Sequence, residues 1–158
     1  MNRTEYLLVT LSEECSEVSE SVCRIFALWF GETDLAKLED NKRTLERELA
    51  DLVATAELLG LVIRDEDKVA GETGKLVTVL SEKCAKVAIR ACKAARFGLK
   101  EVQPGQLEDN TRRLERELAV LVAVVELMNL KIREEDKAAK RAKLEKFMVY
   151  SKEVGALQ

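Results

Sequence analysis

The sequence predicts an all-α protein in which two tandem helical repeats form a four-helix-bundle-like pseudo-dimer within one chain. Apolar residues recur every three or four positions almost throughout, alternating β patterns are absent, and Pro104 is the only proline. Residues 80–137 repeat residues 11–68 without a gap, and roughly half of the aligned positions are identical. Because a helix pair with one apolar face is not stable alone, we expect the two copies to bury those faces against each other.

Each repeat is predicted to contain a long helix, a connecting loop, a second long helix and a short helical tail. Asp40-Asn41 and Asp109-Asn110 are the predicted caps of the second helices. The apolar stripe of the first helix comprises Leu8, Leu11, Cys15, Val18 and Val22. The stripe of the second helix comprises Leu45, Leu49, Leu52, Ala56 and Leu59.

The two copies are separated by the segment Gly71-Glu72-Thr73-Gly74. Two glycines this close together weaken a helix and favour a turn. We therefore place the first repeat at residues 1–72 and the second at residues 73–158.

Composition narrows the function classes. The net charge is only −3 and the acidic and basic residues are interleaved, so no basic arm for nucleic acid is present. The N-terminus lacks the layout of a signal peptide, and Glu126 interrupts the apolar run from Leu118 before it could span a bilayer. We therefore expect a cytoplasmic protein that binds neither nucleic acid nor membrane.

The four cysteines occupy equivalent positions in the two repeats, and they are interpreted as free, buried thiols that act as small hydrophobic side chains. They are Cys15, Cys23, Cys84 and Cys92. The chain has no histidine. Its absence argues against a zinc site and against a di-iron carboxylate bundle, whose ligands include histidine.

Four carboxylates of the first repeat are predicted to converge. Each helical residue turns about 100°, so Glu14 and Glu17 lie on one flank of their apolar stripe, and Glu48 and Asp51 lie on the flank of the same sense. In an antiparallel hairpin these flanks meet on one side of the helix pair. Four carboxylates this close repel one another unless cations join them, and an oxygen-only ligand set favours Mg²⁺, with Mn²⁺ as the alternative. Glu13 points to solvent and is an additional candidate ligand.

Ordinary surface acids are common on amphipathic helices, but a comparison with the second repeat distinguishes these four acids from them. Lys83, Lys86 and Val120 replace Glu14, Glu17 and Asp51, whereas Glu13 is retained as Glu82. Three of the four convergent acids are therefore lost from a scaffold that is otherwise kept. This pattern indicates that the acids serve chemistry rather than folding.

The motif Glu13-Glu14-x-x-Glu17 followed by Glu48-x-x-Asp51 resembles the signature of the all-α nucleoside triphosphate pyrophosphohydrolases, which include MazG, its phage-encoded relatives, dimeric dUTPases and dCTP pyrophosphatases. The resemblance covers essentially the whole chain, once per half. Members of that family usually carry one motif set per chain and dimerise, so this chain resembles a tandem-fused duplicate. The second half resembles phage and bacterial MazG-like proteins in Lys93-Ala94-Ala95-Arg96-Phe97-Gly98, in Gln103-Pro104-Gly105-Gln106 and from Lys137 to Tyr150-Ser151.

The resemblance implies Mg²⁺-dependent hydrolysis of a (d)NTP to a (d)NMP and pyrophosphate, in the host cytoplasm if the protein is phage-encoded. Because active sites of dimeric relatives lie near the subunit interface, we expect one composite site per chain, with metal ligands on the first repeat. Relatives often form dimers of dimers, which leaves a homodimer of this fused pair open. The alternative is a catalytically weak or inactive nucleotide-binding or helical interaction protein derived from such an enzyme. The candidate substrate-binding residues are Trp29, Asn41, Lys93, Arg96, Lys137 and Lys140.

Overall fold

The computed structural model describes residues 1–31, 35–68 and 76–158, together with their side chains except those of residues 26–31 and 35. Within these ranges the chain is all-α, as predicted, and contains no strand. None of the described helices is long and apolar enough to cross a membrane. The elements are α1 (Arg3–Gly31), α2 (Leu35–Leu58), the short 3-10 helix η1 (Asp65–Asp67), α3 (Leu76–Phe97), α4 (Asn110–Leu127) and α5 (Glu134–Glu153).

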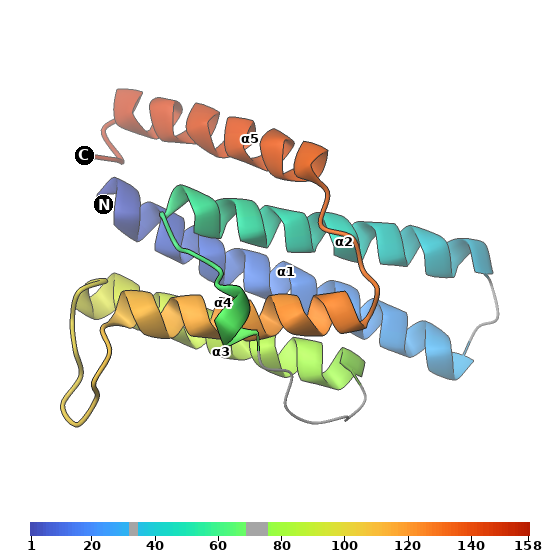
Figure 1. The fold of residues 1–158 in the computed structure, drawn as a ribbon. Helices are drawn as coiled ribbons and strands as arrows, with labels where there is room; N and C mark the ends of the chain where they lie inside the picture. The colour runs from blue at the N-terminus through green and yellow to red at the C-terminus, as the bar shows by residue number, and fades with distance from the viewer. Residues whose placement is uncertain (32–34, 69–75) are drawn as a thin grey trace.

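The core is formed by two helical hairpins, α1 with α2 and α3 with α4, which pack together mainly through α1 and α3 (Figure 1). A single apolar cluster receives side chains from all four helices. The predicted stripes are the faces that it buries, which confirms the helical periodicity of the sequence. Its fully buried members include Leu11, Val18, Leu45, Leu52, Leu80, Val87, Leu114 and Leu121.

Equivalent residues of the two repeats meet where α1 crosses α3. Cys15, Ser16 and Ser19 of α1 line one small cavity together with the residues that correspond to them in α3, which are Cys84, Ala85 and Ala88. Small side chains at these positions let the two helix backbones approach closely. A meeting of equivalent positions is what an internal two-fold axis requires, so this crossing supports the interpretation of the chain as a pseudo-dimer.

The four cysteines are free thiols. Cys15 and Cys84 are buried, as predicted, whereas Cys23 and Cys92 are exposed, so the prediction of buried thiols is wrong for these two.

The segment that precedes α5 docks onto the opposite repeat through Glu46 of α2. The Oε1 atom of Glu46 accepts the backbone N–H of Lys131 at 3.0 Å, and its Oε2 atom lies 2.7 Å from Nη1 of Arg133. Glu46 is only 3% exposed. A carboxylate this deeply buried requires such partners, because an unpaired buried charge is costly.

Glu115 of α4 makes the same contacts in the other direction. It accepts the backbone N–H of Val62 at 3.1 Å and pairs with Arg64, and these residues lie 69 positions before Lys131 and Arg133. Each repeat therefore sends its tail onto the second helix of the other. Two more ion pairs follow the same exchange: Asp136 with Arg43 corresponds to Asp67 with Arg112, and Lys137 with Glu57 corresponds to Lys68 with Glu126.

The predicted caps are confirmed in the second repeat and wrong in the first. The side chain of Asp109 caps α4 by accepting the N–H of Arg112 at 2.8 Å. In the first repeat α2 begins at Leu35, so Asp40-Asn41 lies inside the helix. The second repeat has Pro104-Gly105 where the first has Leu35-Ala36, and Gly105 adopts a φ of +80° that ends helical geometry. Leucine and alanine favour a helix, which extends α2 past its predicted start.

The tails of the two repeats differ more than predicted. The described tail of the first repeat contains only η1, which fits a short helical tail, whereas that of the second is the 20-residue helix α5. The prediction of a short tail was therefore wrong for the second repeat, which continues into helix-forming residues where the first reaches Gly71. Helix α5 lies along α2, and the backbone N–H of Gln158 donates to the carbonyl of Met1 at 3.0 Å (Figure 1). A second small apolar cluster holds it in place: Leu7, Leu144, Met148 and Leu157.

Replacing Glu115 by alanine should lower the free energy of unfolding by about 2 kcal/mol, because the N–H of Val62 and the guanidinium of Arg64 lose a charged acceptor. Urea unfolding followed by circular dichroism measures this loss. The matched control is Glu108→Ala, which removes a more exposed ion pair with Arg116 and should cost less than about 1 kcal/mol. Equal losses in the two variants would contradict the assigned role of Glu115.

Candidate metal site

Three of the four predicted acids come together between α1 and α2. Glu14, Glu17 and Glu48 each offer a carboxylate oxygen, and these oxygens lie within 4.8 Å of one another. Glu14 and Glu17 lie one helical turn apart on α1, and the antiparallel hairpin brings α2 past them with Glu48 on the matching flank. The helical angles of the sequence therefore predicted this cluster correctly.

The cluster runs from the protein interior to its surface. Glu14 is 3% exposed, Glu48 is half-buried and Glu17 is exposed. The Oε2 atom of Glu14 is buried without a hydrogen-bond partner. A buried carboxylate oxygen that lacks a partner is costly, and a cation bound at the cluster would satisfy it.

The fourth acid, Asp51, is linked to the cluster by a lysine. Its Oδ2 atom lies 3.2 Å from Nζ of Lys140, and the same ammonium group donates to Oε1 of Glu14. Lys140 is buried and belongs to α5, whereas all four acids belong to the first repeat. The described site is therefore built from both repeats.

Burial and mutual repulsion raise the pKa values of the acids. Burial raises the pKa of Glu14 to about 7 against the opposing effect of Lys140, and the charges of Glu17 and Asp51 add to it. Burial, a hydrogen bond to Glu17 and the charges of the other acids raise the pKa of Glu48 to about 7. Burial also raises the pKa of Asp51, against Lys140 and Lys143. Burial opposes the charge of Lys140, but its hydrogen bond to Glu14 and the charges of both partners hold its pKa above the usual value.

The remaining metal and substrate candidates lie elsewhere or are unconnected. Exposed Glu13 lines a cavity of about 400 Å³ between α1 and α3 together with Arg96, so neither belongs to the acid cluster. Among the described residues, no ion pair joins Lys93 to the four acids. Lys137 binds Glu57 at 2.6 Å and Glu134 at 2.8 Å instead.

Two further candidates stay predictions. Asn41 is half-buried on α2, seven residues before Glu48, and therefore lies two turns away on the same face of the helix. The side chain of Trp29 lies outside the described residues.

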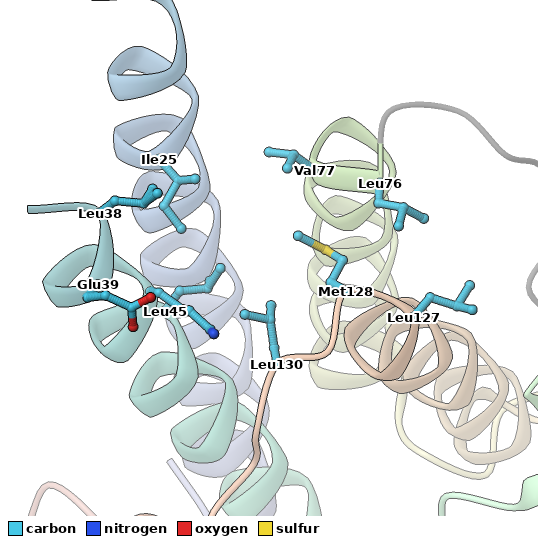
Figure 2. A pocket seen from close by; sticks show the side chains of 10 residues that line it. Ile25, Leu38, Glu39, Leu45, Leu76, Val77, Leu127, Met128 and Leu130 are labelled. Carbon is cyan, nitrogen blue, oxygen red and sulfur yellow. The ribbon is translucent and has the colours of Figure 1, made fainter. Parts of the chain in front are cut away.

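A separate apolar cavity of about 560 Å³ lies between the two hairpins (Figure 2). Leu38 and Leu45 of α2 and Ile25 of α1 face it from one side, and Val77 and Met128 face it from the other. None of the four acids lines this cavity. On α2, Lys42 at its wall and Glu48 fall on opposite flanks about Leu45, because each residue turns about 100°. The cavity and the acid cluster are thus distinct features.

The contact of Lys140 with the acids themselves was missed, although Lys140 had been predicted to bind substrate. A signal for it existed in the repeat. Lys140 stands at the position equivalent to Gly71, so this lysine, like the acids, occurs in one copy only. The sequence could not show that α5 would cross to the first repeat and bring the lysine to Glu14.

The metal-free protein should lose stability as the pH rises from about 4.5 to about 7, because the pKa of Glu48 is about 7 when folded and 4.5 ordinarily. In this window the folded state binds more protons than the unfolded state, so deprotonation favours unfolding. Carboxyls whose pKa is lowered, such as those of Asp67 and Asp136, act below this window.

Thermal unfolding in the presence of a chelator, measured across this pH range, checks the dependence. Glu48→Gln should reduce the slope, and Glu117→Gln, at the equivalent position of the second repeat, should keep it. The same slope in Glu48→Gln and in the wild type would contradict the assignment.

The groups available to bind a metal ion at this site are carboxylate oxygens. Carboxylate oxygens from two helices converge, no histidine is available, and a lysine supplies the local positive charge. Such a set suits a hard divalent cation that prefers oxygen ligands.

Protein-family models, curated proteins and solved structures were each compared with this chain, and none matches it.

Proposed function

We propose that this chain is a Mg²⁺-dependent nucleotide pyrophosphohydrolase that cleaves a (d)NTP to a (d)NMP and pyrophosphate. The observation that carries the proposal is the convergence of Glu14, Glu17 and Glu48 from two antiparallel helices, with one deeply buried oxygen left without a partner. The resemblance of the acidic motif to the signature of the all-α nucleoside triphosphate pyrophosphohydrolases supports the reaction class.

Glu14, Glu17 and Glu48 would hold Mg²⁺ or Mn²⁺. Asp51 lies close enough for its negative charge to raise the pKa values of Glu14 and Glu48. When bound, the metal would neutralise charge on the phosphate oxygens and lower the pKa of a water molecule. A carboxylate of the cluster can accept the proton of the attacking water, so the reaction requires no histidine base. Glu17 is exposed, so a triphosphate would approach the cluster from this side.

The substrate contacts proposed from the sequence gain support at Lys140 and remain open at the other positions. Lys140 comes from the second repeat and contacts the acids of the first. Lys143 lies one turn further along α5, and its positive charge partly opposes the rise in the pKa of Asp51 that burial causes. Two ammonium groups beside the acids would suit the phosphates of a nucleotide. This arrangement supports one composite site per chain.

The corresponding face of the second repeat has paired its charges within the protein. Lys86 binds Glu82 at 2.9 Å, and Arg90 lies 3.8 Å from Glu117. Lys86 and Glu117 stand at the positions equivalent to Glu17 and Glu48, so both positions are engaged in ion pairs. This favours a structural role for the second repeat rather than a second metal site.

One observation favours the alternative, a catalytically weak or inactive nucleotide-binding or helical interaction protein. Lys140 already supplies positive charge to Glu14 and Asp51 without a metal ion. A protein that had lost its reaction could keep these residues as a structural ion pair. The two functions differ in whether a divalent cation is required for turnover.

Pyrophosphate release from a panel of canonical and modified (d)NTPs should require Mg²⁺ or Mn²⁺, and Glu48→Gln should reduce the rate by at least about a hundredfold. The matched control, Glu117→Gln, changes the equivalent residue of the second repeat and should retain the wild-type rate. Metal-independent release, or equal rates in the two variants, would contradict the proposal and leave the alternative.

A composite site also predicts the binding stoichiometry. Titration calorimetry with a non-hydrolysable triphosphate and Mg²⁺ should yield one nucleotide per chain, because the second repeat lacks three of the four acids. Two equivalent nucleotides per chain would overturn the single-site arrangement.

A further inference from the structure

Among the described residues, Lys140 is the only lysine that is buried. It is 7% exposed, and its Nζ atom contacts Glu14 and Asp51. Glu14 also belongs to the group of three carboxylates whose oxygens lie within 4.8 Å of one another. Burying a lysine is costly unless opposite charges compensate it. The carboxylates are equally costly without a nearby positive charge, so the lysine and the acids stabilise each other in the metal-free protein.

A metal ion would compete with this ammonium group. Oε1 of Glu14 receives the hydrogen bond of Lys140, and its other oxygen is buried without a partner. A divalent cation held by Glu14, Glu17 and Glu48 would lie beside a positive charge that already uses one of those carboxylates. Because like charges repel strongly in a poorly solvated site, the two cations cannot both be held tightly.

The ammonium group of Lys140 can move away from the acids while helix α5 stays docked. On either side of Lys140, Lys137 and Arg141 bind Glu57, and further along α5 Leu144 packs in the second apolar cluster. The backbone of α5 is therefore anchored near Lys140. Its four-carbon side chain is flexible, so the ammonium group can move without undocking the helix.

We infer that Lys140 is an internal cation that occupies the acid cluster when no metal is bound and is exchanged for the divalent ion. The inference rests on the metal site of the proposed function and adds that the lysine determines the metal affinity. The repeat is consistent with this pairing, because the second copy has lost three acids and the first copy has Gly71 at the position equivalent to Lys140.

Titration calorimetry with Mn²⁺ alone tests the exchange. Lys140→Met should bind Mn²⁺ at least about tenfold more tightly than the wild type, because the competing charge is gone. Lys140→Arg keeps the charge and should retain approximately wild-type affinity. The control Lys146→Met removes an exposed lysine of the same helix, and it should also bind Mn²⁺ as the wild type does.

A second measurement uses the unmodified chain, in case Lys140→Met does not fold. Reductive methylation followed by mass spectrometry reports the accessibility of each lysine. Lys140 should react slowly in metal-free protein and at least about fivefold faster with saturating Mn²⁺, whereas Lys137 should react at the same rate in both.

The outcomes separate the two proposals. Equal Mn²⁺ affinity in wild type and Lys140→Met, or unchanged protection of Lys140 at saturating Mn²⁺, would overturn the exchange while leaving the metal site intact. No Mn²⁺ binding to either protein would overturn the metal site and the exchange together.

Discussion

Two buried carboxylates determine how the halves of this molecule are assembled. Glu46 and Glu115 each accept a backbone N–H and form an ion pair with an arginine from the tail of the opposite repeat. Apolar stripes alone would bring four helices together, because burial of hydrophobic surface is not directional. The carboxylates add direction, since each is buried and must meet its own partners. They therefore specify where each tail crosses, and the position of α5 follows from that crossing.

The candidate site depends on this exchange. The hairpin of α1 and α2 brings three acids to one point, and among its described residues no ion pair joins them to a lysine or arginine of the hairpin itself. The tail of the second repeat supplies a positive charge by carrying Lys140 across to Glu14 and Asp51. A site with such a charge balance is formed only when both halves are folded together. The proposed chemistry is consequently a property of the pair rather than of the repeat that contains the acids.

Most of the fold and the centre of the site could be predicted from the sequence. The apolar stripes and the acid cluster follow from helical periodicity, which depends on local spacing. The predictions failed where the structure depends on a small local difference between the two repeats, or on a contact between residues that are distant in the sequence. Leu35-Ala36 in place of Pro104-Gly105 moved the start of α2, and the continued helix α5 brought a lysine to the acids from another repeat. Arg96 lines a cavity together with Glu13 instead, which no helical angle within one element could show.

Residues 1 and 158 are joined by a hydrogen bond between their backbones, so the path of the chain almost closes on itself. Joining these ends with a short linker and opening the chain at the exposed turn around Gly105-Gln106 would keep the described helices and their contacts. In such a circular permutant the chain would begin and end within the second repeat. The order of the two repeats along the chain is thus not something that the fold itself requires.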